Sequence, residues 1–333
     1  MGILKLLLMV QQSPSKQVQK HAGFTLIELL VGLIIAALVI TPLLGFMINI
    51  LQTDRREQAK ARSEQELQTA AEYIRRDLDQ AVYIYDADGV EAIKDQLLNE
   101  TDKKPILVFW KRKFVPDILP VPTGTDGKNC NGDCNDTFVF SLVAYYLITD
   151  DGTTDNVWSG RARIGRFEIQ DSAKTDDGGV IGGGNDPDTG DFQIDEDTPK
   201  RAKRSPGFQF DLSALSGNSL TEKMNNWKKT DEAYTNSADV LLDYIDHTAA
   251  AVPAEEDCPS DPKWQVVPSS DATYGFYACV DSDTHKTAQV FLRGNALGRL
   301  NNKNNIPEYD ANISTFFPSV QLEATGSGSL ILN

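Results

Sequence analysis

A single carboxylate inside a long apolar run is the group in this sequence best placed to do chemistry. Glu28 is the sole ionisable side chain between Phe24 and Leu51. A helix over this stretch would be about 42 Å long, which exceeds the ~30 Å core of a bilayer. A carboxylate in such a helix is costly without a cation. Cutting the Gly23–Phe24 bond would supply one, because it would release an α-amino group close to Glu28.

The residues around this carboxylate resemble the processing site of type IV prepilins and type II secretion pseudopilins. The resemblance is carried by Gly23-Phe24-Thr25-Leu26-Ile27-Glu28, which combines a glycine, a small polar residue and a carboxylate at one fixed spacing. It implies cleavage after Gly23 by prepilin peptidase, N-methylation of Phe24 and lateral assembly through Glu28. The simpler alternative is a plain transmembrane anchor with a stray glutamate.

Charge bias predicts the orientation of the chain in a membrane. Residues 1–23, the predicted leader, contain three basic side chains and no acidic one: Lys5, Lys16 and Lys20. Basic segments stay in the cytoplasm, so we expect a single-pass inner-membrane protein with a cytoplasmic leader and a periplasmic head. An ordinary secretory signal fits poorly, since a short apolar region ending in a small-residue cleavage site is missing.

The start of the leader departs from the prepilin pattern. Residues 3–10 are mostly apolar, whereas prepilin leaders are usually polar and basic. Translation from Met9 instead of Met1 would leave a leader that fits the pattern better. The two starts predict different masses for the intact precursor.

The apolar pattern predicts a helix that continues beyond the membrane. We assign residues 24–51 to the transmembrane part and 52–88 to an amphipathic stem, with Pro42 expected to bend the helix. Apolar residues recur in the stem at steps of three and four: Leu67, Ala71, Ile74, Leu78 and Ala81. The helix is expected to reach about Tyr85 and to stop at the turn-forming residues 86–89.

The remaining residues, 89–333, predict an α+β head. Short runs rich in β-branched and aromatic residues indicate strands at 105–114, 137–148, 161–169, 207–212, 274–280, 288–293 and 316–324. Residues 218–229 and 237–246 are predicted to be short helical or mixed segments. One long helix followed by many strands is typical of a helix packed on a largely antiparallel sheet, as in pilins.

An acidic, glycine-rich segment at 175–199 interrupts the head. Four of its acids, namely Asp186, Asp188, Asp191 and Asp197, form a weak candidate for calcium, which takes six to eight oxygen ligands. Their order does not match an EF-hand, and a solvated acidic loop is the simpler interpretation. No other cofactor is indicated.

Net charge and cysteine content narrow the possible partners and compartment. Loss of the three leader lysines takes the net charge from −16 to −19, which argues against bulk nucleic-acid binding. The even number of cysteines favours disulfides outside the cytoplasm, and we favour the pairs Cys130–Cys134 and Cys258–Cys279. A zinc site is the alternative, although the spacings match no standard ligand pattern.

Two further segments resemble particular minor subunits. Residues 71–82 are similar to the stem-to-head passage of J-type minor pseudopilins and W-type minor pilins, and residues 240–246 are similar to their Val-Leu-Leu segment. The leader, stem and acidic head also resemble pseudopilins of hormogonium polysaccharide secretion in filamentous cyanobacteria. The resemblance implies a minor subunit near the tip of a pseudopilus, used in polysaccharide or protein export or in motility. Its expected partners are prepilin peptidase, other pilins, the inner-membrane assembly platform and, before assembly, membrane lipid.

Two other functions remain open from the sequence. One is an adhesin or ligand-binding module at a pilus tip, and the other is a membrane-anchored exported enzyme. The chain has no zinc-protease, nucleophile-elbow or phosphate-loop motif, so we expect no enzymatic activity. His247 and His285 are expected to be surface residues.

Overall fold

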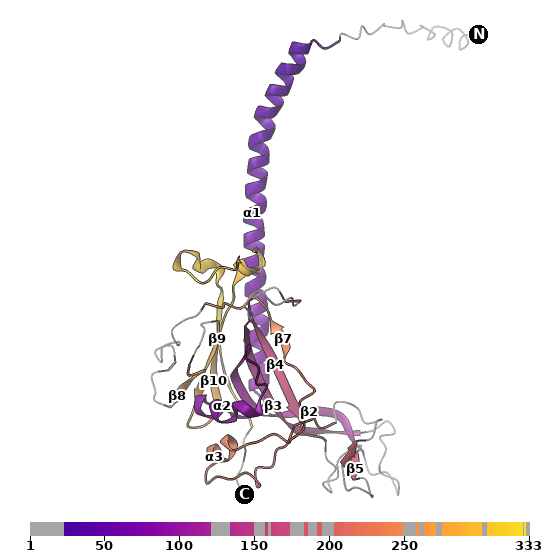
Figure 1. Cartoon of the computed structure of the whole chain (residues 1–333), viewed down its shortest axis with the longest axis vertical. Helices are drawn as coiled ribbons and strands as arrows, with labels where there is room; N and C mark the ends of the chain where they lie inside the picture. Colours follow the sequence, from indigo (N-terminus) through magenta and orange to yellow (C-terminus); the bar gives the residue numbers. More distant parts are fainter. Residues whose placement is uncertain are drawn as a thin grey trace, which may run out of the picture. The chain divides into compact units, whose positions relative to one another are not determined.

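The computed structural model divides the chain into two compact units, Met1–Asp54 and Arg55–Asn333 (Figure 1). The second is called the head unit below. The structure describes residues 23–120, 134–149, 157–158, 161–173, 183–185, 192–194, 203–248, 258–259, 263–270, 275–301, 305–328 and 330.

The first unit consists of the apolar part of helix α1 (Leu26–Leu78). The side chains of residues 23–54 are all exposed. Helix α1 is long and apolar enough to cross a membrane. The helix continues through Pro42, where the neighbouring Thr41 hydroxyl donates to the Ala37 carbonyl at 2.7 Å. A single apolar helix of this kind fits a single-pass membrane anchor.

The described part of the head unit contains two larger antiparallel sheets and a two-stranded one, so the predicted α+β class is confirmed (Figure 1). The first sheet has the order β1-β2-β3-β4-β7, with β1 Ala81–Ile84, β2 Lys103–Pro120, β3 Cys134–Thr149, β4 Ala162–Gln170 and β7 Asp239–Leu242. The second has the order β11-β10-β9-β8, with β8 Trp264–Val267, β9 Phe276–Asp281, β10 Thr287–Arg293 and β11 Ser319–Thr325.

The smaller elements lie between these strands. Strands β5 (Gly183–Asn185) and β6 (Phe192–Ile194) form a two-stranded sheet. The short helices are α2 (Ala87–Ile93), α3 (Leu220–Asn225) and the 3-10 turns η1 (Lys94–Gln96), η4 (Ala296–Arg299) and η6 (Ala311–Phe316).

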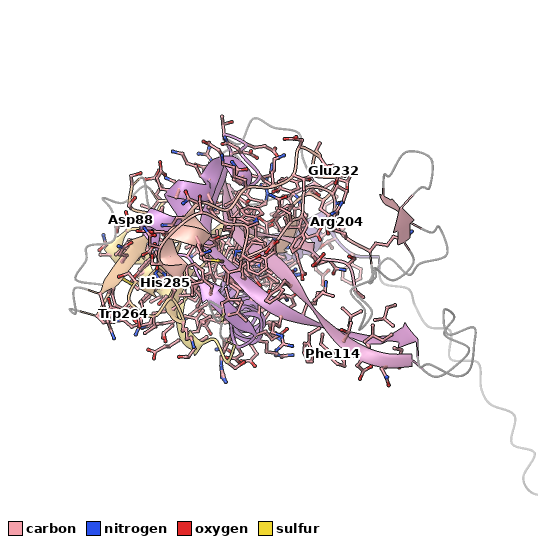
Figure 2. The ribbon with its side chains drawn as sticks, turned by 90° about the horizontal axis from the view of Figure 1, so that it is seen from below. Asp88, Phe114, Arg204, Glu232, Trp264 and His285 are labelled. Atoms are coloured by element: carbon pink, nitrogen blue, oxygen red, sulfur yellow. A yellow bond between two sulfur atoms is a disulfide. The ribbon has the colours of Figure 1, made fainter. Side chains whose placement is uncertain are left out.

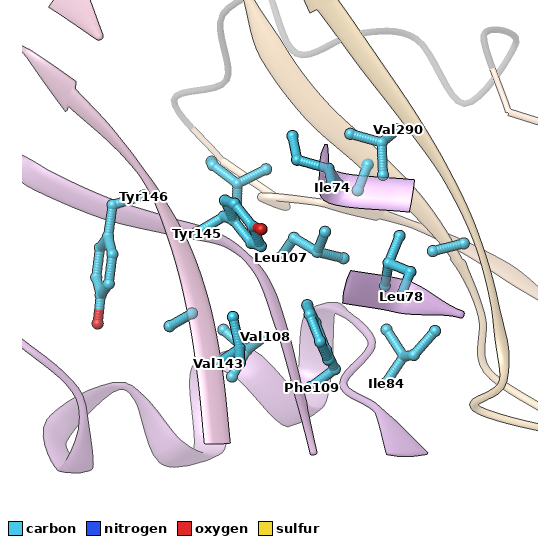
Figure 3. Close-up of a cluster of buried hydrophobic side chains, with 14 of the residues drawn as sticks. Ile74, Leu78, Ile84, Leu107, Val108, Phe109, Val143, Tyr145, Tyr146 and Val290 are labelled. Atoms are coloured by element: carbon cyan, nitrogen blue, oxygen red, sulfur yellow. The ribbon is translucent and has the colours of Figure 1, made fainter. Parts of the chain in front are cut away.

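The second half of α1 is buried by both sheets. Its buried face consists of Ala59, Ser63, Leu67, Ala70, Ala71, Ile74, Asp77 and Leu78. Figure 3 shows Ile74 and Leu78 between Leu107 and Phe109 of β2 and Val290 of β10. The predicted apolar stripe of the stem is therefore core, and the helix supplies apolar surface to two sheets at once.

A glycine allows the second sheet to approach the helix closely. A Cβ on Gly294, at the end of β10, would lie 2.8 Å from Ser63 Oγ and 2.9 Å from Leu67 Cδ1, too close for any other residue without a shift. Gly294 also pairs with Ile245 in an isolated bridge, and the Ile245 amide donates to the Ala162 carbonyl at 2.9 Å. This bridge connects the second sheet to β4 of the first.

The predicted end of the long helix is wrong. Helix α1 ends at Leu78, and residues 81–84 form the buried strand β1 beside β2. Residues Ala81 to Ile84 are apolar and rich in β-branched and aromatic types, and such residues favour a strand wherever a sheet edge is available. Asp86 accepts a hydrogen bond from the Gly89 amide at 2.8 Å and so begins helix α2. Residues 86–89 start a helix instead of stopping one.

The strand predictions are confirmed, with one exception. Residues 207–212 form no strand; Phe208 and Phe210 instead pack on Trp110, with ring centroids 5.7 and 4.2 Å apart. Packing against the first sheet overrides local propensity there. Residues 237–246, predicted to be a short helical or mixed segment, contain strand β7 and no helix.

One buried carboxylate connects α1 to three strands. Asp77 Oδ1 accepts a hydrogen bond from Lys111 Nζ of β2 at 2.6 Å. Its Oδ2 accepts from the Tyr145 hydroxyl of β3 and from Arg166 Nε of β4, both at 2.7 Å. Burial by itself raises the pKa of the Asp77 carboxyl, but Arg166 and Lys111 outweigh it and hold the pKa below its usual range.

Glu168 of β4 completes this group on the same face of the sheet. It accepts from Ser141 Oγ and from Arg166 Nη1, both at 2.8 Å, and lies 3.2 Å from Lys113 Nζ. Burial raises its pKa, yet Lys111, Arg166 and Lys113 lower it further, to about 2. The two carboxylates and their partners are called the Asp77 network below.

We predict that Asp77→Ala lowers the free energy of unfolding by about 3 to 5 kcal/mol, because it leaves Lys111 and Arg166 buried with one fewer anionic partner. The measurement is urea unfolding of the full chain in a nonionic detergent. Glu72→Ala is the control, because Glu72 pairs with Arg76 on the same helix while 52% of its side chain is exposed. That variant should lose less than about 1 kcal/mol, and an equal loss in both would contradict the role of Asp77.

Acid should weaken the head through the same network. The folded-state pKa of Glu168 is about 2, below its ordinary value of 4.5, so the network stabilises the fold above pH ~4.5 and is lost as pH falls towards ~2. We expect urea titrations between pH 7 and 2 to show a loss on the order of 2 kcal/mol in this window. Glu168→Gln should be less stable at neutral pH and should depend less on pH. An unchanged pH dependence would disprove the assignment.

Candidate functional site

The residues predicted to be processed lie just before α1 begins. Gly23 to Thr25 are not helical, and the helix starts at Leu26. The Glu28 amide donates to Thr25 Oγ1 at 3.3 Å, and the Leu29 amide donates to the Thr25 carbonyl at 3.1 Å. Thr25 is therefore the N-cap of α1.

This arrangement leaves the Gly23–Phe24 bond open to an enzyme. Phe24 is 80% exposed, and a Cβ built on Gly23 would meet no atom within 4 Å. The bond precedes the capped turn and takes no part in the helical hydrogen-bond ladder. The Gly23–Phe24 bond is thus exposed and lies outside the helical part of α1.

Glu28 occupies the first turn of α1, where the unpaired amides of a helix favour a negative charge. Thr25 and Glu28 also have the spacing of a capping box. In this motif the side chain of each residue accepts a hydrogen bond from the backbone amide of the other. Sequence reasoning used Thr25 only as a small polar residue and missed its capping role. The pattern Ser/Thr-x-x-Glu would have revealed it.

Comparison with known families finds a match to the segment around Gly23 and Glu28. A model described as the prokaryotic N-terminal methylation motif matches residues 18–44, which include Gly23, Phe24, Glu28 and the first turns of α1. No curated protein and no solved structure matches the chain.

The motif defines the class of the N-terminal region. The chain carries the prokaryotic N-terminal methylation motif and is similar to type IV prepilins over this region. The motif implies processing by prepilin peptidase and assembly with other pilins, and it is consistent with a structural role. The remaining residues, from 45 onwards, have no counterpart in these comparisons.

The cysteines are only partly described. Cys258 and Cys279 form a disulfide, with Cys279 in the middle of β9 and fully buried. The predicted partner pair involves Cys130, which lies outside the described residues, and Cys134, whose side chain is not described. Pairing of Cys130 with Cys134 therefore stays a prediction.

The weak calcium candidates Asp186, Asp188, Asp191 and Asp197 also lie outside the described residues, so that site stays a prediction. Within the described ranges, no group of three or more His, Cys, Asp or Glu side chains is arranged to hold a metal ion.

The prediction that both head histidines lie at the surface is wrong for His285. This side chain is 4% exposed and stacks on Tyr83 with ring centroids 4.6 Å apart. Its Nδ1 lies 3.1 Å from the Ile84 carbonyl oxygen, and its Nε2 lies 3.1 Å from Thr221 Oγ1. His285 thus joins β1, α3 and the turn after β9, which is a structural role. His247 is half-buried, and burial lowers its pKa.

Proposed function

We propose that this protein is a minor pseudopilin, a structural subunit of a type IV pilus-like or type II secretion-like pseudopilus that serves export or surface motility. The observation that carries the proposal is the position of Glu28, one turn after an exposed Gly23–Phe24 bond and at the start of an exposed apolar helix. Cleavage would place the Phe24 α-amino group close to this carboxylate, on the same chain or on a neighbouring subunit.

The proposed topology follows from the same residues. The leader stays in the cytoplasm, α1 crosses the inner membrane, and the head unit lies in the periplasm before the subunit enters the filament. The apolar side chains of the first unit then exchange lipid for neighbouring helices. Glu28 makes this exchange favourable, because a buried carboxylate gains most from a cation in a medium of low dielectric constant.

The size of the head unit supports a place near the filament tip. It has two sheets around α1, and the long β2–β3 hairpin extends beyond the part of the first sheet that β1 and β4 flank. Such a head would interfere sterically with a subunit stacked above it, whereas a tip position leaves it free.

We predict that Gly23→Leu blocks processing. Co-expression of the wild-type chain with prepilin peptidase should yield a protein that lacks residues 1–23 and carries a methyl group on Phe24, as measured by intact mass. The Gly23→Leu variant should keep the precursor mass. Gly32→Leu is the matched control, because Gly32 is also free of neighbours within 4 Å and lies beyond the cleaved bond. Cleavage of the Gly23 variant at the same position would contradict the assignment.

Glu28→Leu should leave membrane insertion and cleavage intact but reduce incorporation into filaments by about tenfold or more, which corresponds to losing an interaction of ~1.4 kcal/mol. The measurement compares the sheared filament fraction with the membrane fraction in the strain that carries the partner pilins. Glu64→Leu, which removes an exposed carboxylate farther along α1, is the control and should assemble normally. Normal assembly of the Glu28 variant would remove the proposed Phe24–Glu28 pairing.

A further inference from the structure

The outer face of the first sheet, away from α1, carries a continuous row of aromatic side chains. Trp110, Arg112 and Phe114 are alternate residues of β2. Alternate residues of a strand share a face, so the three side chains lie on the same side of the sheet. Phe114 lies directly opposite Phe138 of β3, and Arg112 lies opposite Phe140. Asp77 and α1 occupy the other face, through Lys111 and Phe109.

One end of this row is covered by the chain itself. Phe208 and Phe210 pack on Trp110, and Phe210 also lies 4.8 Å from Phe140 between ring centroids. Trp227 packs on Trp110 from the same side, at 5.4 Å. The outer face is therefore built to receive an irregular polypeptide segment with aromatic residues at alternate positions.

The other end of the row is uncovered. Phe114 and Phe138 are 48% and 53% exposed, although their rings lie only 5.4 Å apart. Strand β1 pairs with β2 no farther than Lys111, and β4 pairs with β3 no farther than Ser141. The described rest of the hairpin, residues 112–120 and 134–140, is called the arm below. It stands away from the packed body, as Phe114 shows in Figure 2.

The arm is not simply an unpacked extension. Its opposite face holds a small buried cluster of Val115, Ile118, Val139 and Ala173, each at most 5% exposed. Among the described residues of the arm, the face with Phe114 and Phe138 carries the exposed aromatic side chains. Two adjacent exposed aromatic rings on a structured arm are typical of a contact surface.

A cation accompanies the two rings. The Arg112 guanidinium lies over the Phe138 ring, 4.9 Å from its centroid, and the residue is exposed. Within the part of the chain that the structure describes, Arg112 forms no ion pair, whereas Lys111 and Lys113 on the other face are paired with Glu168. Arg112 is thus available to a carboxylate that approaches the rings.

We propose that the arm binds an extended segment of a partner protein, with aromatic residues at alternate positions and a neighbouring carboxylate. The chain's own residues Phe208 and Phe210 show the aromatic part of this chemistry where they continue the row, and the carboxylate is inferred from the exposed guanidinium of Arg112 beside Phe138. The partner segment lies across the face of the arm. It does not extend the sheet at β2, because Pro116 lacks an amide donor and Asp117 has a φ of 51° at that edge.

The partner is a different molecule from a second copy of this chain. In a second copy the corresponding Phe208 is 1% exposed and is already used inside its own head. The proposal does not depend on Glu28 or on filament assembly, so it can fail while the proposed function stands.

The test uses the full chain in a nonionic detergent and a fluorescent heptapeptide with the sequence of residues 206–212, Pro-Gly-Phe-Gln-Phe-Asp-Leu, as a model of the partner segment. Fluorescence anisotropy should show binding that weakens by about tenfold in Phe114→Ser and in Phe138→Ser. Arg112→Gln should weaken binding by about threefold and reduce its dependence on salt. A peptide with Asn in place of Asp should bind the wild-type chain and Arg112→Gln equally.

Tyr309→Ser is the matched control, because Tyr309 is also an exposed aromatic residue, at 39%, and lies outside the arm. It should bind the peptide like the wild type. The three arm positions are exposed, so thermal unfolding should show that their variants keep the native fold.

Three results would overturn the proposal. The first is peptide binding that is absent, or that the arm variants do not change. The second is self-association of the wild-type chain in sedimentation that Phe114→Ser abolishes while the peptide does not bind, which would assign the arm to a second copy. The third is binding of cellohexaose in place of the peptide, with the same dependence on Phe114 and Phe138, which would assign the arm to a saccharide.

Discussion

The structure of the head unit depends on keeping one charge buried. The Asp77 carboxylate lies at the end of α1, is 6% exposed, and contacts β2, β3 and β4 through Lys111, Tyr145 and Arg166. Such a charge is tolerated only while its hydrogen bonds and opposite charges are all in place. The network therefore fixes the rotation and the height of the helix on the sheet, which apolar contacts alone determine less sharply. The apolar face of α1 can then meet the second sheet through Leu67 and Gly294.

Near its other end the same helix carries the carboxylate of Glu28, which is exposed instead of buried. Asp77 has its cationic partners within the head, whereas Glu28 lies on an exposed turn. A carboxylate whose partners belong to the same chain stabilises the fold. One whose proposed partner is created by cleavage, or belongs to another subunit, is suited to assembly. The two ends of α1 thus use the same chemistry for folding and for the proposed function.

The described part of the head unit combines a closed core with an exposed aromatic surface on the arm. The inner faces of both sheets pack against α1. Segment 207–229 covers the outer face of the first sheet near Trp110. The arm extends the same aromatic row beyond this cover. Any specificity of the proposed minor subunit would have to come from surfaces of this kind, because the segment up to residue 44 matches a motif that many proteins share.

The sequence by itself determined the features that depend on neighbouring residues. The Gly23–Phe24 bond, the apolar run around Glu28 and the stripe of Leu67, Ile74 and Leu78 are all local patterns, and periodicity reveals them directly. Most strands of the head were predicted for the same reason. The α+β class followed from the order of these elements.

Tertiary structure decided the features that depend on residues far apart in the chain. Residues 81–84 could extend the helix or pair with β2, and only the presence of β2 makes the strand the better choice. His285 belongs to a polar run, yet Tyr83 and Thr221 bury it. The partners of Asp77 come from three strands up to 89 positions away. Local patterns carry no information on such pairings, because burial and charge compensation are established only when the strands come together.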